Sequence, residues 1–257
     1  MDKRIGAQLF TCRDYCKTAP ELEQTMKRVK EIGYKTVQIS AIGAEITGKE
    51  VKAAAESAGV EIVCTHRSFA EYMEKLDETI QLHLDMGCNI AGLGMMPVES
   101  MQSKEALFEV LEKFNVIAKK CAENGITFGY HNHAFEFTKL DGKHVLDIIM
   151  ENTDDNLKLI LDTYWVAHAG IDPVKIMEKY ADRIAVMHYK DKKVTGSNNA
   201  EIAEVGEGNL DWDAIIEANE RLGIKWAMVE QDRNWTDEDP FKSLEMSYKF
   251  LTTKGFI

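Results

Sequence analysis

LKLILDTYWVAHAGIDPVKIMEKYADRIAVMHYKD, residues 157–191, is the stretch that predicts the fold of the whole chain. It contains two apolar runs of strand length, 157–161 and 184–187, with a helical pattern between them. Short apolar runs bounded by polar residues are typical of buried parallel strands joined by a crossover helix. Asp162 follows the first run and His188 the second, so we expect the two side chains to lie side by side at the carboxyl ends of neighbouring strands.

The same unit recurs on both sides of this stretch. A helical pattern, a glycine and an apolar run follow one another at Gly33, Gly59, Gly87, Gly125 and Gly223. A glycine just past a helix takes the left-handed conformation that closes the last turn, so each marks a helix-to-strand switch. Two further switches, at 152–156 and 181–182, and the N-terminal run complete a set of eight predicted strands. We place them at 5–10, 35–40, 61–66, 89–94, 126–131, 157–162, 184–189 and 225–230.

Capping signals mark the helix starts between these strands. They are the capping-box pairs Thr18 with Glu21 and Thr47 with Glu50, the pairs Asp172-Pro173 and Asp239-Pro240, and Asp211 before 212–222. The segment 192–209 is expected to be a long loop on the strand-end side. Alternating strands and helices could form an open doubly wound sheet, but eight even units favour one α/β domain over 1–257, a single (β/α)8 TIM barrel. No GxGxxG or GxxxxGK[ST] fingerprint follows a strand.

Composition limits the partners. The formal net charge is −12, from 43 acidic and 31 basic residues, which disfavours nucleic acid and membrane partners but allows a local cationic site for a phosphorylated substrate. Cys12 and Cys16 are four apart, with no second pair to complete a zinc site. With no long apolar segment, the expectation is a reduced, cytoplasmic, soluble protein that acts on a small molecule.

Polar side chains cluster at the predicted strand ends. They are Gln38, Glu45, His66, Arg67, His131, Asn132, His133, Glu136, Asp162, Trp165, His188, Lys190, Asp191, Glu230, Gln231 and Asp232. In a barrel these ends meet on one rim, where active sites are built.

Asp162, His188 and Glu230 end three consecutive predicted strands. Two carboxylates and an imidazole suit a divalent Mn, Co, Zn or Fe ion. Such an ion would bind two neighbouring substrate oxygens and polarise a carbonyl, which eases removal of the adjacent C–H proton. The alternative is structural, with Asp162 capping a turn and Glu230 pairing with Arg233.

Five motifs resemble the sugar isomerases and epimerases that have a xylose-isomerase-like TIM barrel. They are YHNHAFEF (130–137), LDTYW (161–165), VMHYKD (186–191), VGEGNLDW (205–212) and VEQD (229–232), and the resemblance covers essentially the whole chain. In that family one divalent metal is held by a Glu, an Asp, a His and a Glu on strands 5 to 8. The last three match Asp162, His188 and Glu230.

The strand-5 position departs from the family pattern, because Gly129 stands where its Glu is expected. Gly129, His131 and His133 would share one strand face. His131 or His133 could be the fourth ligand, or Glu136 could reach back; we favour His131. The departure also means that an imidazole must be one of the catalytic bases, so we assign catalysis to His133 and Glu230.

Four further residues are expected to contact substrate. His66 would hydrogen-bond it, Trp165 would stack on a sugar face, Lys190 would bind an oxygen or a phosphate, and Glu136 is a further contact. For Trp165, packing against the protein is an equal alternative. For Lys190, the equal alternative is a solvated lysine with no ligand.

The resemblance implies a metal-dependent isomerase or epimerase of a sugar, keto-sugar or cyclic polyol. It would abstract a proton next to a metal-bound carbonyl and pass through an enediolate. The same residues could serve a lyase or dehydratase acting on a 3-keto sugar or keto-inositol. Two other classes are a phosphodiester hydrolase resembling apurinic-site endonucleases, which the acidic balance disfavours, and a non-catalytic sugar-binding barrel. Homo-oligomers are frequent in the family.

Overall fold

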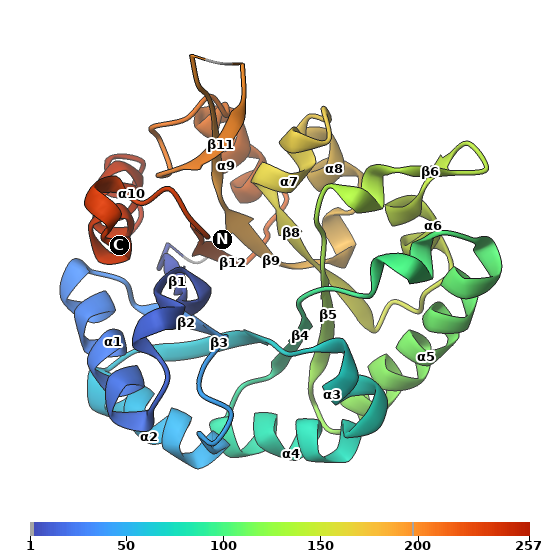
Figure 1. Ribbon diagram of the computed structural model, residues 1–257, viewed down its shortest axis with the longest axis horizontal. Helices are drawn as coiled ribbons and strands as arrows, with labels where there is room; N and C mark the ends of the chain where they lie inside the picture. The colour runs from blue at the N-terminus through green and yellow to red at the C-terminus, as the bar shows by residue number, and fades with distance from the viewer. Residues whose placement is uncertain (1–2, 197) are drawn as a thin grey trace.

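Eight parallel strands curve into a nearly closed barrel in the computed structural model, which describes residues 3–196 and 198–257 (Figure 1). The strands are β1 (Gly6–Gln8), β2 (Thr36–Ser40), β3 (Glu61–His66), β4 (Ile90–Leu93), β5 (Thr127–His131), β8 (Leu157–Asp162), β9 (Ile184–Tyr189) and β12 (Trp226–Val229). Each falls within a predicted range, and the expected (β/α)8 architecture is confirmed.

The order around the sheet is β3-β2-β1-β12-β9-β8-β5-β4. An isolated parallel bridge between Arg67 and Leu93 joins the two outermost strands, β3 and β4. Around it, the Arg67 N–H donates to the Gly92 carbonyl at 2.8 Å, and the Gly94 N–H donates to the Arg67 carbonyl at 3.2 Å. The ring is therefore closed by a short joint, whereas each other pair of neighbouring strands shares a ladder of at least two residue pairs.

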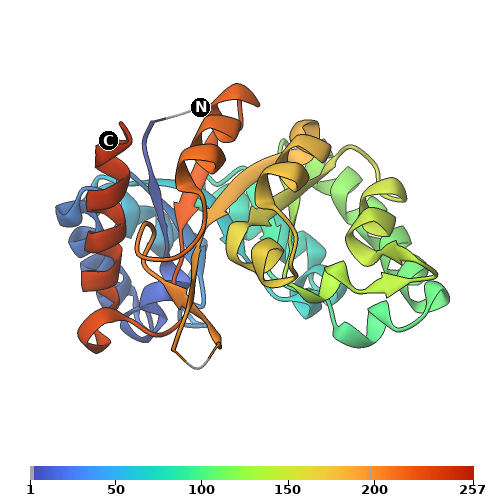
Figure 2. The ribbon, with the colours of Figure 1, turned by 90° about the horizontal axis from the view of Figure 1, so that it is seen from above.

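Helices surround the strands, as Figures 1 and 2 show. They are α1 (Ala19–Ile32), α2 (Gly48–Ala58), α3 (Phe69–Glu74), α4 (Leu76–Met86), α5 (Lys104–Glu123), α6 (Val145–Glu151), α7 (Thr163–His168), α8 (Pro173–Lys179), α9 (Trp212–Arg221) and α10 (Pro240–Thr253). The predicted caps are present: Thr18 and Thr47 form complete capping boxes, and Asp172, Asp211 and Asp239 accept from the first helical turns.

Short elements fill the connections. They are the 3-10 helices η1 (Leu9–Tyr15), η2 (Val98–Met101), η3 (Phe135–Phe137), η4 (Ala181–Arg183) and η5 (Thr236–Glu238), and the paired strands β6 (Lys139–Leu140) with β7 (Lys143–His144) and β10 (Asp191–Val194) with β11 (Ala200–Ala203). The expected loop 192–209 is therefore partly a β-hairpin, which stands out from the barrel in Figure 2.

The main apolar core lies between the strands and the helices, and a smaller cluster that includes Ile160 and Met228 fills the barrel. All five cysteines are buried and free, and burial raises the pKa of the Cys16 thiol to about 12. Among the described residues, no helix combines the length and the apolar character needed to cross a bilayer.

Candidate active site

Four side chains meet at the carboxyl ends of four strands that are consecutive in the sheet. His131 ends β5, Asp162 ends β8, His188 lies near the end of β9, and Glu230 directly follows β12. One nitrogen or oxygen atom from each lies within 4.8 Å of the others. His131 Nε2 lies 3.5 Å from Asp162 Oδ2, and His188 Nδ1 lies 2.8 Å from Glu230 Oε2. The structure thus brings together the four residues predicted as metal ligands.

The cluster contains buried atoms whose bonding capacity is unused. His131 Nε2 and Asp162 Oδ2 have no hydrogen-bond partner within the described chain, although buried polar atoms are normally bonded. His188 Nδ1 and Glu230 Oε2 can sit 2.8 Å apart only with a proton or a cation between them. Two imidazoles and two carboxylates suit a divalent transition metal, so these residues fit such an ion.

Outer contacts orient both imidazoles toward the cluster. His188 Nε2 lies 2.8 Å from Gln38 Oε1, and His131 Nδ1 lies 3.2 Å from the Gly94 carbonyl. Both oxygens only accept, so these nitrogens donate, which leaves His188 Nδ1 and His131 Nε2 directed at the cluster, where their lone pairs would bind a cation held between them and the carboxylates. Glu230 Oε1 in turn accepts from Gln8 Nε2 at 3.0 Å.

Gly129 occupies the inner layer of β5, below His131. A Cβ built on Gly129 would lie 3.1 Å from the Cδ1 and Cγ1 atoms of Ile160. A larger side chain would therefore have to displace Ile160, which packs inside the barrel. The donor at this strand comes instead from His131, the next residue on the same face.

Lys190 points its ammonium at three carboxylates. Its side chain is 1% exposed, and Nζ lies 2.7 Å from Asp232 Oδ2, 3.5 Å from Glu230 Oε2 and 3.7 Å from Asp162 Oδ2. Burial by itself lowers the pKa of Lys190, but the charges of Glu230, Asp162 and Asp232 outweigh burial and raise it. Lys190 therefore remains a cation.

The carboxylates respond to the same surroundings. Burial raises the pKa of Asp162, and burial together with the Glu230 charge raises the pKa of Asp232 to about 6. Burial acts to raise the pKa of Glu230, but the neighbouring Lys190 and His188 outweigh burial and hold this pKa well below its ordinary value. Glu230 is therefore the most strongly ionised of the three.

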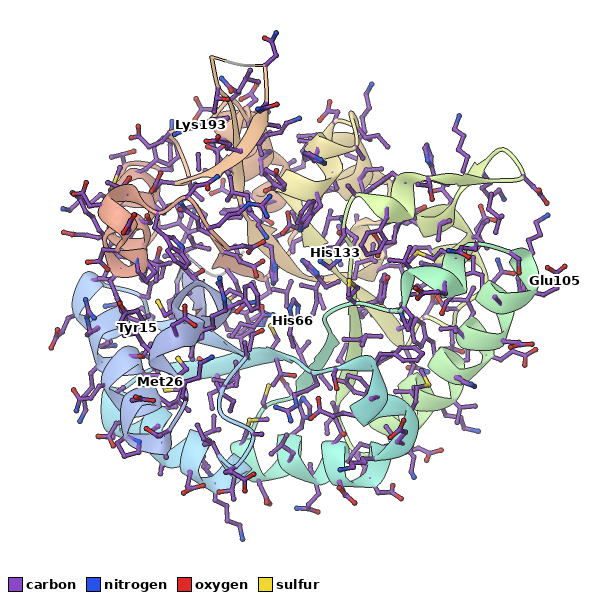
Figure 3. The ribbon with its side chains drawn as sticks, in the orientation of Figure 1. Tyr15, Met26, His66, Glu105, His133 and Lys193 are labelled. Carbon is purple, nitrogen blue, oxygen red and sulfur yellow. The ribbon has the colours of Figure 1, made fainter. Side chains whose placement is uncertain are left out.

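A cavity of about 610 Å³ adjoins the cluster. His66 and His133, which lie in the middle of the ring in Figure 3, both line it. Burial and the neighbouring His131 lower the pKa of His133 to about 3, so its imidazole is neutral at pH 7. His133 Nδ1 and His66 Nε2 are buried without a hydrogen-bond partner in the described residues. The ring of His66 lies 4.7 Å from that of His131, between centroids.

The structure does not bring Glu136 to the cavity, contrary to expectation. Its Oε1 accepts from the Tyr130 hydroxyl at 2.5 Å, and its Oε2 accepts from the His133 N–H at 2.8 Å. Successive side chains of β5 point to opposite faces, so Tyr130 points away from His131 and toward the helices, where its ring packs against Phe114. Glu136 follows Tyr130 to that side, and burial raises the pKa of its carboxyl to about 7.

Trp165 lies behind the cavity and is absent from its lining. Its ring centroid is 5.3 Å from that of His133 and 5.2 Å from Lys190 Nζ. It therefore packs against two side chains of the site, which agrees with the packing alternative, and stacking on a substrate stays a prediction.

Three contacts of the site were not predicted: those of Gln8 with Glu230, of Gln38 with His188 and of Asp232 with Lys190. Gln8 and Gln38 are paired in register on β1 and β2, and each orients one member of the cluster. A signal existed: each is a polar residue within an apolar strand, in IGAQLF and TVQIS.

Asp191, which lies two residues after the end of β9, holds the 205–212 motif in place through hydrogen bonds. Its buried carboxylate accepts from five donors, which are the backbone N–H groups of Lys192 (2.7 Å), Gly206 (2.9 Å), Gly208 (3.0 Å) and Leu210 (3.3 Å) and the indole N–H of Trp212 (2.6 Å). A Cβ on Gly208 would lie 2.2 Å from Asp191 Oδ1, so only glycine permits this approach.

Comparison with known proteins gives a consistent family. The sequence model of the xylose isomerase-like TIM barrel family matches residues 26–252. Inosose dehydratase from Geobacillus kaustophilus (strain HTA426) is 28% identical over 204 residues, 66% of this chain and 61% of that protein. Inosose dehydratase from Lacticaseibacillus casei is 27% identical over 151 residues, 52% of this chain and 50% of that one. The matches thus span only about half to three fifths of these relatives.

A crystal structure of a sugar phosphate isomerase/epimerase from Parabacteroides distasonis ATCC 8503 superposes with a TM-score of 0.84. The match covers 100% of this chain and 96% of the other, at 22% identity, and so shows a common fold.

Proposed function

The chain belongs to the xylose isomerase-like TIM barrel family, and from that premise we propose that it is a metal-dependent enzyme acting on a sugar or cyclic polyol. The reaction is isomerisation or epimerisation of a hydroxyketone by proton transfer at the carbon next to the carbonyl. The observation that carries the proposal is the cluster of His131, Asp162, His188 and Glu230 beside a cavity lined by His133.

The cluster residues would hold one divalent ion of Mn, Co, Zn or Fe. When bound, such an ion polarises a carbonyl and lowers the barrier to removing the neighbouring proton. Gln8, Gln38 and the Gly94 carbonyl keep the donor atoms aligned.

His133 is the proposed base. It lines the cavity, its Nδ1 has no partner among the described residues, and a neutral imidazole accepts a proton there. Hydrogen bonding through the His133 backbone to Glu136 and packing against Trp165 fix the position of the ring.

Asp232 is the proposed second proton-transfer group, in place of Glu230. Both Glu230 oxygens face partners, Gln8 and His188, whereas Asp232 Oδ1 has none in the described chain. Asp232 follows β12 and His133 follows β5, at opposite ends of the four-strand segment that carries the cluster. Two groups on different sides of a substrate carbon are what epimerisation needs.

Deuterium exchange tests the proposal. The Mn²⁺-loaded protein is incubated in D₂O with keto-sugars and with an inosose, and NMR follows deuterium entering at the carbon next to the carbonyl. We expect exchange that His133→Gln abolishes and that Asp232→Asn slows while metal content stays unchanged. A fully metal-loaded protein that exchanges no proton of any of these compounds would contradict the proposal.

Dehydration is the second candidate, favoured by the two inosose dehydratase relatives and by a proton donor in the site. Lys190 is a buried ammonium that lines the cavity, and a departing hydroxyl group needs a proton. The same NMR spectra would then show loss of water from the inosose, in addition to deuterium exchange.

A further inference from the structure

The cavity has two unlike walls. The cluster occupies β5, β8, β9 and β12, and the other wall comes from the segments that follow β1 to β4. That second half contributes six apolar lining residues, which we call the apolar wall: Phe10, Phe69, Ala70, Met95, Met96 and Pro97. It also contributes Ser40, His66, Arg67 and Ser68. Polar chemistry and apolar surface therefore face one another across the cavity.

Met95 shows most clearly that the apolar wall is available to a ligand. It follows β4 and is 48% exposed, although it lines a concave site, whereas its neighbour Met96 is fully buried. Methionine is flexible and polarisable, so it adapts to apolar ligands of different shape. Exposed apolar surface within a binding cavity indicates apolar ligand atoms.

The lysine and arginine side chains that line the cavity already form ion pairs with carboxylates of the protein. Arg67 and Lys190 are the two basic side chains that line the cavity within residues 3–196 and 198–257. Arg67 forms an ion pair with Glu71, and Lys190 faces Asp162, Glu230 and Asp232. Both of these side chains already pair with carboxylates, so a phosphate group would find no unpaired Lys or Arg among the described lining residues, and the site disfavours it.

We propose that the substrate is an uncharged keto-sugar or keto-polyol that carries an apolar or aromatic substituent. Its hydroxyketone faces the cluster, and its substituent lies on the apolar wall. The cavity, at about 610 Å³, is within the usual range of about 300–1,000 Å³ for sites that hold ligands larger than one sugar ring. This inference rests on the proposed function, because it assigns the polar wall to the reacting carbons.

Binding of stable glucosides tests the inference apart from turnover. Isothermal titration of the Mn²⁺-loaded protein compares phenyl β-D-glucoside, methyl β-D-glucoside and D-glucose 6-phosphate, none of which carries the ketone. We expect the phenyl compound to bind at least about tenfold more tightly than the methyl compound, because its ring buries more apolar surface. Glucose 6-phosphate should bind more weakly than the methyl glucoside.

A matched pair of variants locates the effect. Met95→Ser should reduce the ratio of phenyl to methyl affinity by about fivefold, since it removes apolar surface from the wall. Val98→Ser is the control, because Val98 is 45% exposed in the same segment but does not line the cavity, and it should leave the ratio unchanged.

Equal affinities for the two glucosides, no binding of either, tightest binding of the phosphate, or an unchanged ratio in Met95→Ser would each overturn the inference. None of these outcomes bears on deuterium exchange with simple keto-sugars, which tests the proposed function separately.

Discussion

Asp191→Asn should lower the free energy of unfolding by about 3–6 kcal/mol. The carboxylate accepts from five N–H donors, with Lys192 and Leu210 on Oδ1 and Gly206, Gly208 and Trp212 on Oδ2. An asparagine has one oxygen, so in either orientation its NH₂ group faces at least two of these donors. Two lost bonds to a charged acceptor, at about 1.5–3 kcal/mol each, give the stated range.

Urea unfolding followed by circular dichroism measures the loss, and hydrogen exchange at the Gly206 and Gly208 amides shows where it arises. Asp172→Asn is the matched control, because Asp172 is an exposed N-cap whose carboxylate, within the described part of the chain, accepts from Val174 N–H alone, at 2.9 Å. Asparagine caps a helix as well as aspartate, so the control should change stability by less than about 0.5 kcal/mol. A loss below about 1 kcal/mol in Asp191→Asn, with unchanged exchange at both glycines, would refute the reasoning.

Three further predictions concern the metal, strand 5 and pH. Asp162→Ala and His188→Ala should stay folded but lose bound Mn²⁺ on elemental analysis; full occupancy in either would contradict the ligand set. Gly129→Glu should destabilise the protein by about 1–3 kcal/mol without tighter metal binding, because the new side chain meets Ile160; unchanged melting would contradict this. Burial lowers the pKa of His83 from 6.5 to about 4, so the unfolded chain binds this proton first as the pH falls. The contribution of neutral His83 to the free energy of unfolding is full above about pH 6.5 and falls by about 3 kcal/mol toward pH 4. Urea unfolding of His83→Gln should therefore show a smaller decrease in stability over this pH range.

The strands and the cluster could be predicted because their signals are local. Each strand is a short apolar run, and Asp162 and His188 stand directly at the ends of two of them. Once the barrel is assumed, neighbouring strands bring these side chains together, as their register shows.

The contacts of Glu136 and Lys190 could not be predicted, because they depend on distant geometry. β5 ends at His131, and the η3 turn carries Glu136 back to Tyr130 on the helix side, which strand alternation does not indicate. Lys190 finds Asp232 across 42 positions of sequence. The apolar wall gathers residues from three separate segments, the helices η1 and α3 and the loop after β4, which come together only in the folded barrel.

The joint between β3 and β4 is the shortest strand pairing in the ring. One bridge, at Arg67 and Leu93, holds it. The cavity lining includes His66 and Arg67 on one side of this joint and Gly94 and Met95 on the other. A molecule that fills the cavity would contact residues on both sides of this joint and would connect them. We therefore expect a bound molecule to stabilise the ring at this joint, in addition to occupying the site.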